Sequence, residues 1–243
     1  MLSIFSAFYD AWTHHRDQEV SITLGDDLNQ ELFSQYHEVV HNEKKVIAIE
    51  KLIKNHLGEN TYLDISQALL SNDLRKADMV FRVLQSARAL KNSRKIMEHL
   101  SNDAVAKVFE LSRQVANEAH LFQGFVRFHE LENGILYSEI SPKNQVLTCI
   151  ADYFCNRFPM EDWIIMDKTH HMSLIHPRGQ KWFLVAHDDN VFPRPSSLDS
   201  EDVFEQLWKD FFSAISIKER ENYRLQRGNL PLRYRKHMLE FNE

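Results

Sequence analysis

Six short segments between residues 125 and 187 constrain the fold more than any other feature of the sequence. Two β-rich runs, 125–131 and 135–141, flank a tight turn with Asn133-Gly134, which is the strongest hairpin signal in the chain. A helical period follows over 144–158, and three more β-rich runs come after it, at 162–167, 172–176 and 181–187. Because most of the connections are too short for a parallel crossover, this order predicts an antiparallel α+β unit.

The first hundred residues predict a mainly helical region. Apolar residues recur at helical spacing over 2–14, and again over three stretches between residues 43 and 91 with breaks near Gly58 and Asn72. The run 20–24 predicts a strand. The fold class is therefore α+β, in which a mostly helical N-terminal region packs with the antiparallel-sheet unit.

Further helices precede and follow the β-rich segments. A long helix is predicted to begin at an N-cap, either Ser101 or Asp103, and to end at Gly124. Two more helices, 203–215 and 232–241, close the chain.

We accordingly divide the chain into a mainly helical region, 1–100, and an α+β region with an arginine-rich C-terminal segment, 101–243. A single continuous domain is the alternative.

The composition is that of an ordinary globular chain. Apolar side chains make up 43% of the 243 residues, which is enough for one large core or two modest ones. No run approaches the roughly 18 apolar residues of a membrane-spanning helix, and the first residues lack the pattern of a secretory signal. Cys149 and Cys155 match neither a C-x-x-C pair nor a disulfide framework. We therefore expect reduced thiols, a cytoplasmic location and no membrane partner.

Arginine gathers near the C-terminal end of a chain that is otherwise acidic. Between residues 218 and 236, seven Lys or Arg stand against two acids, a local balance of +5, so the rest of a chain of net charge −6 carries −11. The arginine fork fits phosphate, and the interleaved Tyr223 and Tyr234 are typical of surfaces on which nucleic-acid bases stack. The alternative is that these arginines pair with the chain's own surplus acids.

Glu118 and His120 are the candidate catalytic acid and base. Arg113, Asn117 and His120 recur at i, i+4 and i+7, so they share one face of the predicted long helix, and Glu118 lies beside it. A carboxylate next to a histidine fits general acid–base catalysis. The alternative is a helix face that contacts solvent or a partner.

Histidine is frequent, but its spacing does not predict a metal site. Five acidic and histidine side chains could gather at one end of the sheet: Asp167, His170, His171, His176 and His187. Neighbouring histidines diverge and no H-E-x-x-H pattern occurs, so we expect no metal and no cofactor. The phosphate loop, the dinucleotide fingerprint and the G-x-S-x-G elbow are also absent, which disfavours NTP hydrolysis, dinucleotide chemistry and serine hydrolysis.

Three segments carry an ordered pattern: EAHLFQGFVRFHEL (118–131), ISPKNQVLTCIADYFCNRFPMEDWIIMD (140–167) and LWKDFFSAISIKERENYRLQRGNLPLRYRKHMLEF (207–241). Together they resemble a bacterial family labelled "probable DNA metabolism protein". The matching positions are Glu118, His120, Gly124, Arg127, Arg157, Lys218, Glu219, Arg220, Arg224, Arg227, Arg233 and Tyr234. The family commonly has Trp after R-Y, where this chain has Arg235.

The resemblance implies a role in DNA metabolism without assigning a reaction. Members of that family accompany a radical SAM protein associated with DNA modification or repair, and some are fused to a uracil-DNA glycosylase-like domain. DNA and a radical SAM protein are therefore the partners that the resemblance implies.

Three functions from different classes remain open. The first is an accessory protein of DNA repair or modification, which binds nucleic acid or a radical SAM partner through an arginine-rich surface. The second is a DNA-processing enzyme of glycosylase or hydrolase type that uses Glu118 and His120, and the third is a protein-only interaction scaffold. The expected binding residues are Arg127, Lys218, Arg220, Arg224, Arg227, Arg233, Tyr234 and Arg235.

Overall fold

A computed structural model of the chain describes residues 2–14, 20–25, 34–131, 133–187 and 222–238, together with the single residues 207, 211, 214 and 241. The chain forms two compact units, Met1–Asn117 and Glu118–Glu243. Each unit has a hydrophobic core of its own. The division falls inside the long helix α5, Asp103–Phe125, which supplies residues to both cores.

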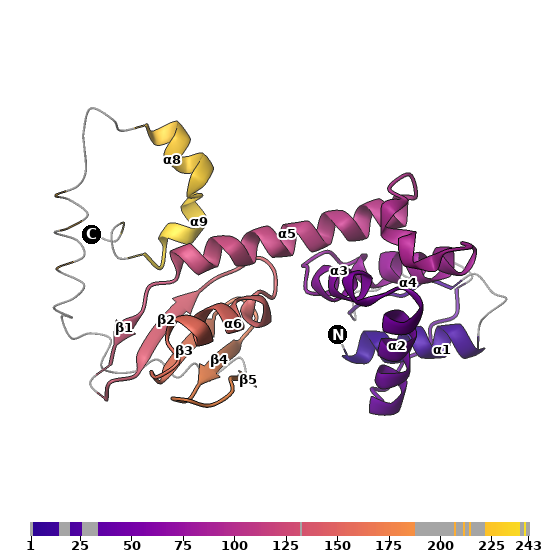
Figure 1. The fold of residues 1–243 in the computed structure, drawn as a ribbon, viewed down its shortest axis with the longest axis horizontal. Coiled ribbons are helices and arrows are strands. Elements are labelled where there is room, and N and C mark those ends of the chain that lie inside the picture. The colour runs from indigo at the N-terminus through magenta and orange to yellow at the C-terminus, as the bar shows by residue number, and fades with distance from the viewer. Residues whose placement is uncertain are drawn as a thin grey trace. The chain divides into compact units, whose positions relative to one another are not determined.

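The first unit is built from helices, as the apolar periodicity predicts (Figure 1). Its elements are α1 (Leu2–His14), α2 (Glu43–His56), α3 (Glu59–Leu69), α4 (Lys76–Arg88), the short 3-10 helix η1 (Ser93–Glu98) and the first part of α5. The breaks at Gly58 and Asn72 separate α2, α3 and α4 as expected. Phe5, Phe8, Ile53 and Ile65 are fully buried where these helices meet.

The predicted strand at residues 20–24 is wrong. This segment has no regular structure, although Val20, Ile22 and Leu24 pack on the helical core with the alternation that suggested a strand. The backbone N–H of Ile22 donates to the Asp78 carboxylate at 3.2 Å, and the Ser21 hydroxyl donates to the same oxygen at 3.0 Å. A side chain of α4 therefore takes the place of a neighbouring strand as a hydrogen-bond partner.

The long helix α5 is confirmed, but its cap is Asn102 rather than Ser101 or Asp103. The Asn102 side chain accepts hydrogen bonds from the N–H groups of Ala104 at 3.0 Å and Val105 at 3.3 Å. An asparagine serves as well as serine or aspartate here, because each presents an oxygen to the first free N–H groups of the helix.

The second unit contains a five-stranded sheet in which the strands follow chain order, so the α+β class is confirmed. The strands are β1 (His129–Glu130), β2 (Leu136–Ile140), β3 (Trp163–Asp167), β4 (Met172–His176) and β5 (Phe183–Ala186). The prediction of an antiparallel sheet is wrong at one joint: the sheet is mixed, because β2 and β3 pair in parallel while all other neighbours are antiparallel. The parallel pair occurs at the one joint that holds a helix, α6 (Leu147–Arg157), which is long enough for a crossover.

The core of this unit lies between α6 and one face of the sheet. Ile140, Trp163, Ile165 and Leu174 project from three neighbouring strands and pack in one cluster with α6 residues such as Ile150. Figure 1 shows α6 covering this part of the sheet. The hairpin turn also forms as predicted, since Gly134 has the positive φ of 78° that a tight turn requires.

Two short helices near the C-terminal end complete the described part of the unit. They are α8 (Tyr223–Asn229) and α9 (Leu232–Arg235), and α9 is shorter than the predicted helix 232–241. Tyr234 of α9 is buried against Phe122 and Phe125 of α5, with ring centroids 5.0 and 5.3 Å away. Figure 1 accordingly shows α9 beside the C-terminal part of α5. The predicted helix 203–215 lies outside the continuously described residues.

Candidate functional site

Glu118 is the centre of a buried polar cluster. It is only 3% exposed, and its carboxylate accepts hydrogen bonds from the backbone N–H of Lys143 at 2.9 Å and of Asn144 at 2.8 Å. The Asn144 side-chain amide donates a third hydrogen bond at 2.6 Å. A guanidinium nitrogen of Arg233 lies 3.6 Å from the same carboxylate.

These contacts give Glu118 an anchoring role. Three donors from the loop 141–146 and one cation from α9 occupy its carboxylate oxygens, so α5 holds the loop and the C-terminal segment with one side chain. A buried carboxylate of this kind is costly unless it is fully partnered. The sequence identified the residue, and the structure gives it partners other than His120.

His120 lies apart from Glu118 on the helix surface. The two residues are two positions apart on α5, which turns their side chains about 200° away from each other. His120 is exposed, as are Arg113 and Asn117 on the same helix face, whereas Glu118 is buried. The helix therefore presents His120 on a solvent-facing stripe, and it does not bring the expected acid and base together.

Arg127 closes the C-terminal end of α5. One guanidinium nitrogen donates to the carbonyl of Gly124 at 2.8 Å and to that of Val126 at 3.2 Å. Cations are favourable at this end of a helix because the last carbonyl groups lack partners within the helix. The side chain is thus engaged with the backbone around the predicted helix end.

Arg233 and Tyr234 act as a pair. Arg233 donates to the Tyr234 hydroxyl at 2.7 Å, and its guanidinium carbon lies 4.7 Å from the centroid of the same ring. Burial raises the pKa of the Tyr234 phenol, and the nearby Glu118 carboxylate adds to this effect against the opposing influence of Arg233. The side chain of Arg233 remains 51% exposed, so it can still meet a ligand.

The Arg235 side chain contacts other residues of the C-terminal segment. Two of its nitrogens donate to the Leu230 carbonyl at 3.3 and 3.2 Å, and its guanidinium lies 4.6 Å from the Phe241 ring centroid. Arg233 therefore lies near one of the chain's own acids, Glu118, whereas the contacts given for Arg235 are to a carbonyl and an aromatic ring. Lys218 and Arg220 lie outside the described residues.

Arg224 and Arg227 differ from Arg233 and Arg235 in being exposed without a polar side-chain contact to the rest of the described chain. Both are exposed on α8, three positions apart and therefore neighbours on one helix face. Within the described part of the chain, neither makes an ion pair or a side-chain hydrogen bond. Tyr223, which is 67% exposed, precedes them on the same helix.

A second polar group links the end of β2 to the C-terminal segment, and nothing in the sequence pointed to it. The His237 Nε2 lies 2.8 Å from the Ser141 hydroxyl, and its Nδ1 lies 4.0 Å from a carboxylate oxygen of Glu139. Lys168 donates to that same oxygen at 3.0 Å. Ser141 and His237 are 96 residues apart, and neither belongs to a local motif.

The ionisation of this group follows from its surroundings. Burial lowers the pKa of His237 below its usual 6.5, aided by the charges of Lys236 and Lys168 and opposed by Glu139. Burial alone would raise the pKa of Glu139, but the hydrogen bond and charge of Lys168 outweigh it and lower the pKa. His237 is therefore neutral near pH 7, and Glu139 is ionised.

Three of the histidines near the sheet each contact a different partner residue. His170 Nδ1 lies 2.7 Å from Asp167, His176 stacks on Trp163, and His187 lies 2.8 Å from the Ser173 hydroxyl. Among the residues that the structure describes, no three His, Cys, Asp or Glu side chains are placed to hold a metal ion.

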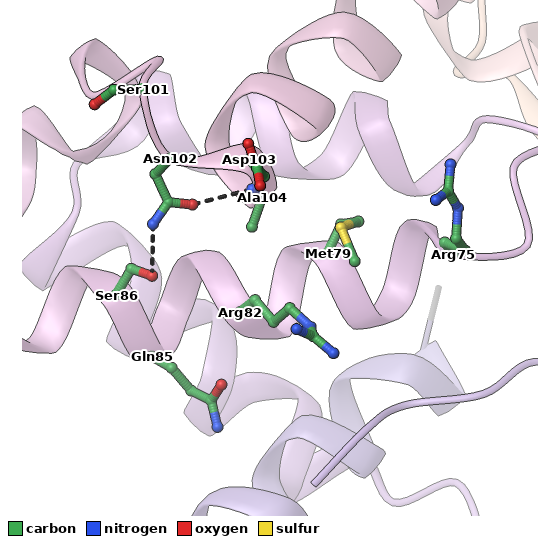
Figure 2. A pocket seen from close by; sticks show the side chains of 9 residues that line it. All are labelled: Arg75, Met79, Arg82, Gln85, Ser86, Ser101, Asn102, Asp103 and Ala104. Carbon is green, nitrogen blue, oxygen red and sulfur yellow. Dashed lines mark hydrogen bonds between the residues drawn. The ribbon is translucent and has the colours of Figure 1, made fainter. Parts of the chain in front are cut away.

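A groove of about 660 Å³ lies in the first unit between α4 and the start of α5 (Figure 2). Arg75 and Arg82 line it, and each pairs with an aspartate of its own segment. Asn102 spans one end by donating to the Ser86 hydroxyl at 3.1 Å, as Figure 2 shows. The two arginines and Asn102 thus have partners within the fold, and none of the predicted site residues lines the groove.

Two remaining findings concern the hydropathy of the helices and the state of the cysteines. No helix in the described ranges is long and apolar enough to cross a membrane. Cys149 and Cys155 are free thiols, and burial raises the pKa of each.

Comparison with known proteins identifies a family to which no function is assigned. No curated protein and no solved structure matches the chain. One family model matches residues 75–240, from the start of α4 through the C-terminal segment that contacts Glu118. Since this match covers more than half of the sequence, the chain belongs to the family described as a domain of unknown function, DUF4130.

Proposed function

We propose that this protein is an accessory factor of DNA repair or modification that binds nucleic acid through α8. The observation that carries the proposal is the exposure of Arg224 and Arg227 on one helix face, with no partner among the described residues. Arginine binds phosphate through two parallel hydrogen bonds, and a nearby exposed aromatic ring such as Tyr223 offers a base a surface to stack on.

The electrostatics favour a local and salt-sensitive contact. The chain carries a net charge of −6 while the stretch 218–236 carries +5, so DNA is attracted to the arginine-rich segment and repelled by an acidic remainder. Arg233 is half exposed beside Glu118 and can add a further phosphate contact. Arg127 and Arg235 are engaged with backbone carbonyls, so we assign them a positioning role rather than a direct one.

A radical SAM protein is the second candidate partner, as the resemblance of the sequence implies. The specific observation in its favour is two exposed leucines: Leu225, which lies between Arg224 and Arg227 on α8, is 61% exposed, and Leu232 on α9 is 60% exposed. Arginine is enriched at protein interfaces, and a partner that covered α8 and α9 would remove these exposed apolar side chains from water. A cytoplasmic location fits both candidates and the two free thiols.

The deciding experiment is fluorescence anisotropy with labelled single- and double-stranded DNA at about 50 and 200 mM salt. The double variant Arg224→Ala/Arg227→Ala is compared with the wild type. For single strands, the slope of log affinity against log salt should become shallower by about 1.4, because each neutralised phosphate contributes about 0.7.

The matched control is Lys91→Ala/Arg94→Ala, which removes two exposed cations from the first unit and changes the net charge equally. This control should leave the salt slope within error of the wild type. No salt-sensitive binding by the wild type, or equal loss in both double variants, would overturn the DNA proposal. In that case calorimetry with the radical SAM companion, using Leu225→Ser/Leu232→Ser as the interface variant, tests the second candidate.

A further inference from the structure

We propose that Ser141, His237 and Glu139 form a nucleophilic site that cleaves carboxylic esters bearing a negative charge. This inference goes beyond DNA binding and does not depend on it. The three side chains come from the end of β2, from the loop after β2 and from the C-terminal segment.

The geometry is that of a nucleophile, a base and an orienting carboxylate. Ser141 Oγ and His237 Nε2 are 2.8 Å apart, which is the distance over which a hydroxyl passes its proton to an imidazole. The opposite ring nitrogen, Nδ1, lies 4.0 Å from a carboxylate oxygen of Glu139. Catalytic contacts are often this long before substrate binds. When Nδ1 carries the proton, Nε2 is free to act as the base.

The position of the group in the fold supports this role. Ser141 follows the last residue of β2, at the carboxyl end of the parallel pair β2–β3, where helix-linked parallel strands present ligand sites. Ser141 is only partly buried. Glu118 fixes the loop through Lys143 and Asn144 and also contacts α9, so the nucleophile and the base are both anchored to α5.

The surroundings define the substrate class. Lys168 donates to Glu139 at 3.0 Å, and Lys236 is the chain neighbour of His237, so the site holds two exposed cations and one carboxylate and favours an anionic group. The reaction needs only the ester and water. Ser141 Oγ attacks the carbonyl carbon while its proton passes to Nε2, and the departing alcohol takes that proton as its carbon–oxygen bond breaks. Water then attacks the acyl-serine through the same base, which releases the acid and restores Ser141.

The chain also contains a matched internal control. Ser173 lies 2.8 Å from Nε2 of His187, the same distance as in the proposed pair, but Ser173 is 2% exposed and its hydroxyl donates to the Met166 sulfur. A reagent that attacks activated and accessible serines should therefore discriminate between two Ser–His pairs of equal length.

The test is labelling of the full chain with a biotinylated fluorophosphonate, followed by mass spectrometry of the tryptic peptides. We expect an adduct on Ser141 in the wild type, none in Ser141→Ala, and unchanged labelling in Ser173→Ala. His237→Asn should slow labelling by about 100-fold or more, because a general base contributes that much. An unmodified Ser141 in the wild type, or equal labelling rates in wild type and His237→Asn, would overturn the proposal.

The pH profile separates catalysis from a structural hydrogen bond. Labelling of the wild type should fall as the pH drops through the pKa of His237, which lies below 6.5. The charged groups facing this histidine are Glu139, Lys168 and Lys236. Because Glu139 raises that pKa, Glu139→Gln should move the midpoint to lower pH, and an unmoved midpoint would remove Glu139 from the site.

The substrate class is tested with two chromogenic esters. The 4-nitrophenyl hemisuccinate should be hydrolysed faster than 4-nitrophenyl acetate, and both activities should disappear in Ser141→Ala. An equal or lower rate on the hemisuccinate would overturn the preference for anionic esters. Circular dichroism melting curves of each variant confirm that a lost signal does not reflect unfolding.

Discussion

At the scale of single residues, Glu118 shows how one buried carboxylate can hold two segments of the chain in place. Its carboxylate meets three hydrogen-bond donors from the loop 141–146 and the guanidinium of Arg233. Such a group stabilises the fold only while every partner is present, because an unpaired buried donor costs about 1–3 kcal/mol.

Glu118→Gln should therefore lower the free energy of unfolding by about 1–3 kcal/mol. The new amide NH₂ would face a donor from the loop 141–146, and the charge that attracts Arg233 would be lost. Urea denaturation followed by circular dichroism measures the change. Glu130→Gln, an exposed position on β1, serves as the control and should stay within about 0.5 kcal/mol of the wild type. Equal stability of the two variants would contradict the anchoring role.

At the scale of elements, the short helix α9 depends on one aromatic side chain. Four residues are too few to form a stable helix alone, so packing must hold α9 in place. Tyr234 supplies that packing against Phe122 and Phe125, while its neighbour Leu232 on the same helix is exposed.

Tyr234→Ala should release the C-terminal segment and cost about 3 kcal/mol of stability, as expected for truncating a buried aromatic residue. Limited trypsin digestion should then cut at Arg224 and Arg227 faster than in the wild type. The exposed Tyr223→Ala is the matched control and should change stability by no more than about 0.5 kcal/mol. Unaltered cleavage in Tyr234→Ala would mean that other contacts hold the segment.

At the scale of the whole molecule, the two separate cores predict that a destabilising substitution in one unit loosens that unit and leaves the other unchanged. Ile53 is fully buried in the first core and Ile165 in the second. Truncating either to alanine should cost about 2–5 kcal/mol in its own unit.

Hydrogen–deuterium exchange can measure this separation. Ile53→Ala should speed exchange in α2 and α3 and spare β3 and β4, and Ile165→Ala should do the reverse. If either variant loosened both units equally, the two cores would have to unfold as one cooperative body.

Most of the elements could be predicted from the sequence because their signals are local. Apolar spacing gave the helices 43–56, 59–69 and 76–88 to within a few residues, and Asn133-Gly134 gave the hairpin turn. The failure at residues 20–24 has a physical cause: alternation reports burial on one side, and Asp78 rather than a strand satisfies the backbone there.

The candidate site could be predicted only in part, because its partners are distant in the sequence. The local pattern identified Glu118, but it paired this residue with His120, which lies on the opposite side of α5. No spacing rule brings Ser141 within 2.8 Å of His237 across 96 positions of the chain. The sequence by itself determined which segments form most of the helices and strands, since the size and polarity of side chains act over a few residues. Only the packing of α9 on α5 and of the loop after β2 on Glu118 decided which polar groups meet.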